Sequence, residues 1–121
     1  MPYKCDALVV TCIDARFQRI FDQWLQQTLG YGRYDRVGFI GGVRSWGAVS
    51  SQIVLSRHLH GISKVVLVNH EECAVYGTGA AAEVNHRVDL LLARQQVLAE
   101  FPDVAVELYY AKLNGMFEHV E

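Results

Sequence analysis

Residues 7–11, Ala-Leu-Val-Val-Thr, decide the fold class of this 121-residue chain. A continuous apolar run, without the alternation of a half-exposed strand, is typical of a strand buried on both faces. Residues 64–68, Lys-Val-Val-Leu-Val, form a second run of this kind. Because such strands occur in parallel sheets that helices cover on each side, the two runs predict an α/β fold.

The rest of the chain supplies the flanking elements. Apolar residues at helical spacing predict helices over residues 17–28, 46–60 and 81–100. Short apolar runs predict further strands over residues 36–40 and 104–111, and Asn114-Gly115 is a hairpin signal that would return residues 116–120 as an edge strand. We therefore expect a mainly parallel sheet of about four strands, flanked by helices, with a C-terminal hairpin edge strand. The buried face of the third helix is expected to consist of Val84, Val88, Leu91, Leu92 and Leu98.

Length and composition restrict the class of protein. Hydrophobic residues make up 51% and charged residues 20% of the chain, so we expect one folded domain over residues 1–121. A net charge of −2 gives no electrostatic reason to expect a nucleic-acid or membrane partner. Three cysteines, without a signal-peptide pattern before them, favour a reducing, cytoplasmic location in which thiols are free for metal chemistry.

Two motifs place metal-ligand side chains at strand ends. Cys12 follows the first apolar run, and His70 follows the run over residues 64–68, with Cys73 three positions later. Because the carboxyl ends of parallel strands meet at one edge of a sheet, these side chains can come together. Two thiols and one imidazole suit zinc, and three protein ligands leave a fourth position open, as in catalytic zinc sites.

Each of these residues also has a structural interpretation. A cysteine beside a buried strand is often a small apolar filler, and Asp14 and Arg16 next to Cys12 could form a salt-bridged turn. Cys5 precedes the first predicted strand and belongs to neither motif, so we assign it a structural role. The combination of both motifs at strand ends favours the metal site.

The ordered pair Cys12-x-Asp14-x-Arg16 and His70-x-x-Cys73 resembles the β-class carbonic anhydrases. The strand before His70, the long helix after it and the closing hairpin over residues 108–115 extend this resemblance. It implies that Cys12, His70 and Cys73 bind Zn²⁺, and that Asp14 and Arg16 form the catalytic dyad. It implies reversible hydration of carbon dioxide to bicarbonate by a zinc-bound hydroxide that the dyad orients. In the family's closed form, Asp14 itself binds the metal until Arg16 recaptures it.

The chain departs from the family pattern at several positions. Residues 41–47, Gly-Gly-Val-Arg-Ser-Trp-Gly, replace a turn like Arg-Asn-Ala-Gly, and Ala74 replaces the glycine after the second cysteine. Two alternatives therefore stay open: a related zinc hydrolase acting on another small electrophile, and a non-catalytic zinc-binding module. About six residues precede the first strand, so the family's N-terminal dimer contacts do not carry over, although we still expect a homo-oligomer.

Two further interpretations concern the surroundings of the site. An apolar pocket for carbon dioxide could be formed by five side chains that could equally be ordinary core: Phe17, Phe39, Val43, Trp46 and Tyr76. His86, on the long helix, could shuttle protons, but we favour a surface histidine without a catalytic task.

Overall fold

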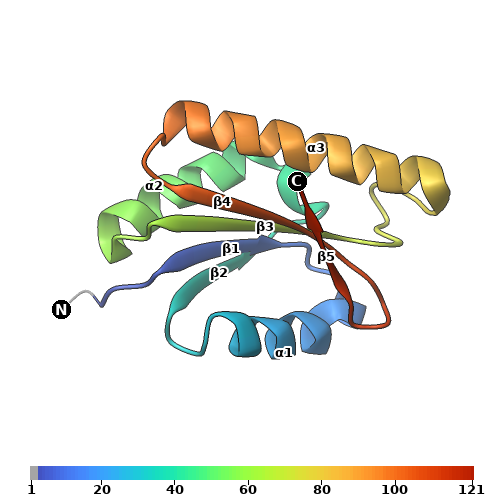
Figure 1. The fold of residues 1–121 in the computed structure, drawn as a ribbon, viewed down its shortest axis with the longest axis horizontal. Helices are drawn as coiled ribbons and strands as arrows, with labels where there is room; N and C mark the ends of the chain where they lie inside the picture. Colours follow the sequence, from blue (N-terminus) through green and yellow to red (C-terminus); the bar gives the residue numbers. More distant parts are fainter. Residues whose placement is uncertain (1–2) are drawn as a thin grey trace.

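The computed structural model describes residues 3–121 and contains one sheet with helices on both faces (Figure 1). Its strands lie in the order β2-β1-β3-β4-β5, and all neighbours are parallel except β4 and β5. The bounds of the strands are Ala7–Thr11 (β1), Tyr34–Gly38 (β2), Lys64–His70 (β3), Ala105–Ala111 (β4) and Phe117–Val120 (β5). The predicted α/β class, the mainly parallel sheet and the C-terminal hairpin are confirmed.

Helices cover the two faces unequally. Helix α1 (Gln18–Thr28) lies on one face, and α2 (Trp46–His60) and α3 (Gly79–Glu100) lie on the other (Figure 1). Two 3₁₀ turns, η1 (Ala15–Phe17) and η2 (Gly42–Arg44), follow the carboxyl ends of β1 and β2. None of the helices in residues 3–121 is long and apolar enough to cross a membrane.

Both faces of the central strands are buried, as the apolar runs predicted. In β1, Ala7 and Val9 pack in the cluster that contains Phe17, Phe21 and Leu25 beneath α1. The alternate residues of β1, Leu8 and Val10, belong to the second cluster, which α2 and α3 cover. Because successive side chains of a strand point to opposite faces, this fully apolar strand contributes to the hydrophobic core on both faces of the sheet.

Strand β3 is longer than predicted. It continues through Asn69 to His70, and His70 pairs with Ala111 of β4. The expectation that His70 follows the strand was therefore wrong. Pairing with β4 continues the ladder past the apolar run, so the strand's last two residues are polar and still buried. This fixes the backbone of His70 within the sheet.

The buried face of α3 is also not the predicted one. Of the five predicted residues, Leu91 is half-buried and packs against the core, whereas the other four, Val84, Val88, Leu92 and Leu98, are 40–58% exposed. The helix packs on the sheet through the alternate stripe Ala82, His86, Leu90, Ala93 and Val97. Both stripes have helical spacing, so periodicity alone does not decide which of them faces the sheet. The second stripe also contains His86, which a hydrophobic pattern counts as polar.

Candidate metal centre

The structure brings the three predicted ligands together. Cys12 directly follows β1, His70 is the last residue of β3, and Cys73 lies in the loop between β3 and α3. One ligand atom from each lies within 4.8 Å of the other two, and all three residues are buried. Because β1 and β3 are parallel neighbours, their carboxyl ends hold the two motifs at one edge of the sheet.

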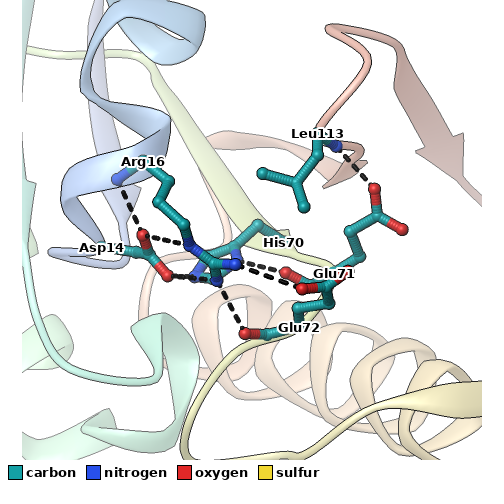
Figure 2. Close-up of polar contacts among 6 residues, drawn as sticks. All are labelled: Asp14, Arg16, His70, Glu71, Glu72 and Leu113. Carbon is teal, nitrogen blue, oxygen red and sulfur yellow. Dashed lines mark hydrogen bonds and ion pairs between the residues drawn. The ribbon is translucent and has the colours of Figure 1, made fainter.

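The imidazole of His70 is prepared to act as a ligand. Its Nδ1 donates to the carbonyl oxygen of Glu71 at 2.7 Å (Figure 2), which leaves Nε2 as the nitrogen with a free lone pair. Nε2 is buried and has no hydrogen-bond partner among residues 3–121. Burial lowers the pKa of His70, and its ring packs against Phe17 with centroids 4.3 Å apart, so the neutral form is held in place. An unpartnered, buried nitrogen fits a metal ion.

The two thiols fit the same ion. Burial raises the pKa of Cys73, and the neighbouring Cys12 raises it further. The nearby sulfur disfavours the Cys73 thiolate, because negative charge on two adjacent sulfurs would repel in a medium of low dielectric. A divalent cation between them would remove that penalty. The donor set of two sulfurs and one nitrogen is one that zinc accepts.

Asp14 and Arg16 form a tightly bonded pair beside these ligands (Figure 2). The carboxylate accepts three hydrogen bonds from Arg16: from the backbone N–H at 2.8 Å, from Nε at 3.1 Å and from Nη2 at 2.8 Å. The side-chain hydrogen bonds from Arg16 lower the pKa of Asp14, so the group is ionised at neutral pH. Asp14 Oδ2 lies 3.9 Å from His70 Nε2, which places a fixed acceptor at the border of the ligand cluster.

Arg16 also holds the loop that carries Cys73. Its Nη1 donates to Glu72 Oε1 at 3.1 Å and its Nη2 to the Glu72 carbonyl at 2.9 Å (Figure 2). Glu72 has a positive φ of 55°, an unusual conformation for a residue other than glycine. Sequence analysis did not predict this contact, because nothing in the motif distinguishes Glu72 from an acidic side chain exposed to solvent.

A polar network lies behind the ligand cluster, on the α3 side of the sheet. Asn69 Nδ2 donates to His86 Nδ1 at 2.9 Å and to Tyr76 Oη at 3.3 Å, and Tyr76 donates to Asp89 at 2.6 Å. His86 is fully buried, and its ring stacks on that of Tyr76 with the ring centroids 3.7 Å apart. The prediction that His86 is a surface residue is wrong. Burial lowers its pKa to about 4, which makes it a poor proton carrier at neutral pH.

The depression beside the candidate ligands differs from the apolar pocket suggested by the sequence. It has a volume of about 300 Å³ and lies at the carboxyl ends of β1 and β2, where Cys12, Asp14, Gln18 and Arg36 line it. None of the five pocket candidates lines this depression. Phe17 is buried beneath α1, whereas Val43, Phe39 and Trp46 pack in the core on the opposite face. Tyr76 belongs to the polar network.

Comparison with known proteins identifies the family. Residues 3–121 match the model of a protein family described as "Putative carbonic anhydrase". The chain belongs to this family. Its resemblance to the β-class enzymes is thereby confirmed, and it is a divergent β-carbonic-anhydrase-like protein.

Relatives of this carbonic anhydrase family member are distant. An uncharacterized protein of Rickettsia conorii is 23% identical over 135 residues, which cover 97% of this chain and 73% of the relative. The crystal structure of a carbonic anhydrase from Streptococcus mutans has a TM-score of 0.74 at 15% identity, covering 100% of this chain and 86% of the other. The β-carbonic anhydrase CafA of Aspergillus fumigatus has a TM-score of 0.63 at 17% identity, covering 98% and 76%. These structures establish the shared fold.

Proposed function

We propose that this chain is a zinc enzyme that catalyses the reversible hydration of carbon dioxide to bicarbonate. Cys12, His70 and Cys73 would hold the metal, and Asp14 and Arg16 would be the catalytic pair. The observation that carries the proposal is the convergence of three buried ligand atoms within 4.8 Å, one of them a nitrogen without a partner among residues 3–121. Membership in the carbonic anhydrase family supports the substrate.

The side chains around the metal have separable tasks. When bound, zinc supplies a Lewis-acid centre that lowers the pKa of a water molecule towards about 7. An ionised carboxylate only accepts hydrogen bonds, so Asp14 would hold the proton of the attacking oxygen and direct its lone pair towards the carbon of the substrate. Arg16 occupies both carboxylate oxygens of Asp14, which supports the open arrangement, with Asp14 off the metal.

The depression at Cys12 and Asp14 offers a place for substrate and product. Arg36 and Gln18 line it, and a guanidinium there would favour the negatively charged product, bicarbonate. The same polar lining favours the second candidate, a zinc hydrolase that acts on a small polar electrophile. A non-catalytic zinc module is the third candidate. It gives no role to the fixed carboxylate of Asp14.

Stopped-flow hydration of carbon dioxide, paired with metal analysis, tests the proposal. Zinc-loaded wild type should hydrate carbon dioxide between pH 6 and 9, and Asp14→Asn should lose activity by on the order of 100-fold while keeping its zinc. Arg19→Gln is the matched control, because Arg19 is exposed and its side chain makes no hydrogen bond or ion pair within residues 3–121. If the protein contains stoichiometric zinc but hydrates no carbon dioxide at any of these pH values, carbon dioxide is refuted as the substrate. Absence of zinc after purification without chelator would refute the metal centre.

We also propose that copies of the chain associate. Val84, Val88 and Leu92 form an exposed apolar stripe on α3, and Val54 and Leu55 are exposed on α2. Apolar side chains arranged in this way support burial against another subunit. Light scattering on the purified protein measures the oligomeric state, and a monomeric mass at all concentrations would refute this part of the proposal.

A further inference from the structure

A second cluster of metal-ligand side chains lies at the other end of the sheet. It consists of Cys5, which precedes β1, Asp35 in β2 and His60 at the end of α2. One ligand atom from each lies within 4.8 Å of the other two. Figure 1 shows the N-terminal segment and the end of α2 at the opposite end of the sheet from the loop between β3 and α3. Strand β1 separates the two clusters, and its five residues span about 16 Å.

The three side chains already contact one another. His60 Nδ1 lies 2.7 Å and 2.8 Å from the two carboxylate oxygens of Asp35. The thiol of Cys5 donates to Asp35 Oδ1 over 3.6 Å. Cys5 is 2% exposed, and the side chains of His60 and Asp35 are 17% and 15% exposed. The carboxylate is therefore the centre of the cluster, with the sulfur and the nitrogen as its neighbours.

The backbone holds these ligands firmly. The N–H of Cys5 donates to the carbonyl of His60 at 3.0 Å, so the backbones of these two residues are joined directly. Asp6 N–H donates to the carbonyl of Arg33 at 2.7 Å, which connects the segment before β1 to the start of β2. Three segments distant in sequence thus meet at fixed positions, as a metal site requires.

The arrangement does not fit a nucleophilic or redox thiol. In a cysteine–histidine pair, the imidazole faces the sulfur and stabilises the thiolate. Here the carboxylate of Asp35 contacts both other groups, and a negative neighbour disfavours the thiolate. The cluster contains one cysteine, and Cys12 and Cys73 lie at the other end of the sheet. A cation that bonds to all three groups would satisfy each of them.

We propose that Cys5, Asp35 and His60 form a second zinc site, separate from the candidate catalytic centre. Sulfur, imidazole nitrogen and carboxylate oxygen are all zinc ligands, and a thiolate with a carboxylate balances the charge of a divalent cation. Two tetrahedral ligands at about 2.0 Å from zinc lie roughly 3.3 Å apart. The nitrogen and oxygen at 2.7 Å must therefore separate slightly on binding. A depression of about 230 Å³ adjoins Asp35 and His60 and gives access for water as a fourth ligand.

Metal content of the full-length protein tests this site. After reconstitution with Zn²⁺ under reducing conditions and removal of weakly bound metal, mass spectrometry should find one ion fewer per chain in Cys5→Ser than in wild type. His60→Gln should lose the same ion. This second variant tests the site independently if Cys5→Ser does not fold. His58→Gln is the matched control, since His58 lies two residues earlier on α2, is exposed and is not in the cluster.

The outcome does not depend on the catalytic proposal. Cys73→Ser should lose a different ion, so the loss in Cys5→Ser/Cys73→Ser should be the sum of the two single losses. Cobalt(II) bound in place of zinc gives a second readout. Its thiolate-to-metal absorption should decrease in Cys5→Ser by the contribution of one of the three cysteine ligands. Equal zinc content in wild type, folded Cys5→Ser and folded His60→Gln would overturn the proposal and would identify the cluster as a hydrogen-bonded anchor.

Discussion

Arg16 donates to both the side chain and the backbone of Glu72, 56 residues away in sequence. The same guanidinium holds the carboxylate of Asp14. One side chain therefore connects the motif after β1 with the loop that carries Cys73. It positions the carboxylate of Asp14 together with the candidate ligands. The guanidinium can do this because it presents five N–H donors in a rigid plane, which a lysine ammonium cannot reproduce.

Arg16→Lys tests this connection. The substitution keeps the positive charge but removes the fork, so Asp14 should lose at least one charge-assisted hydrogen bond. A bond of that kind contributes about 1.5–3 kcal/mol, so we expect carbon dioxide hydration to slow roughly 10- to 100-fold. Glu72→Ala removes only the exposed side-chain contact and should reduce kcat by less than about threefold. Stopped-flow assays of the two variants, with Arg19→Lys as the control, measure whether Arg16→Lys loses more rate than Glu72→Ala. Hydration by Arg16→Lys at the wild-type rate would contradict the prediction.

Zinc affinity at the candidate catalytic centre should rise with pH. Binding requires thiolates, and the pKa of Cys73 is raised by burial, so its proton must be displaced by the metal throughout the neutral range. His70 contributes no proton there, because burial lowers its pKa and the ring is already neutral. Each displaced proton gives about a tenfold rise in affinity per pH unit. Competition with a chromophoric chelator from pH 6 to 8 measures the slope. The same affinity at both ends of that range would show that the thiols are not the ligands.

The sequence predicted the proximity of Cys12, His70 and Cys73 better than it predicted their surroundings. Cys12 directly follows β1, His70 ends β3 and Cys73 lies in the loop after it, and the rule that parallel strands end at one edge brings them together. The buried role of His86 was missed because a histidine on a helix counts as polar in any periodic pattern. Its buried Nδ1 accepts a hydrogen bond from Asn69 in β3, which lies 17 residues earlier in the sequence. Contacts of this kind arise from packing between a helix and a strand, and the periodic pattern of one helix contains no information about them.

His86 should make the fold sensitive to acid. The pKa of His86 is about 4 in the folded chain because of burial, against an ordinary value of 6.5. The unfolded chain therefore binds the proton more tightly, and stability that is present above about pH 6.5 is lost as the pH falls towards 4. The difference corresponds to about 3 kcal/mol. Urea denaturation of His86→Leu at pH 7 and pH 4.5 should show a smaller loss of unfolding free energy than wild type. His58→Gln, which changes an exposed histidine, should behave as wild type, and equal losses in all three proteins would contradict the prediction.

The turn before α2 should depend on Gly42. This residue has a φ of +56°, and a Cβ there would lie 2.8 Å from Asn69 Oδ1, the side chain that also contacts His86. Gly42→Ala combines a left-handed backbone with this clash, so we expect a loss of about 1–3 kcal/mol in unfolding free energy. Gly47→Ala is the matched control, because nothing lies within 4 Å of a Cβ at Gly47 in the described chain and the residue is in the first turn of α2. That variant should be neutral or more stable by up to about 1 kcal/mol. Thermal and urea unfolding of the two variants measure the contrast. If Gly42→Ala were as stable as Gly47→Ala, the close approach of η2 to Asn69 would not restrict this turn.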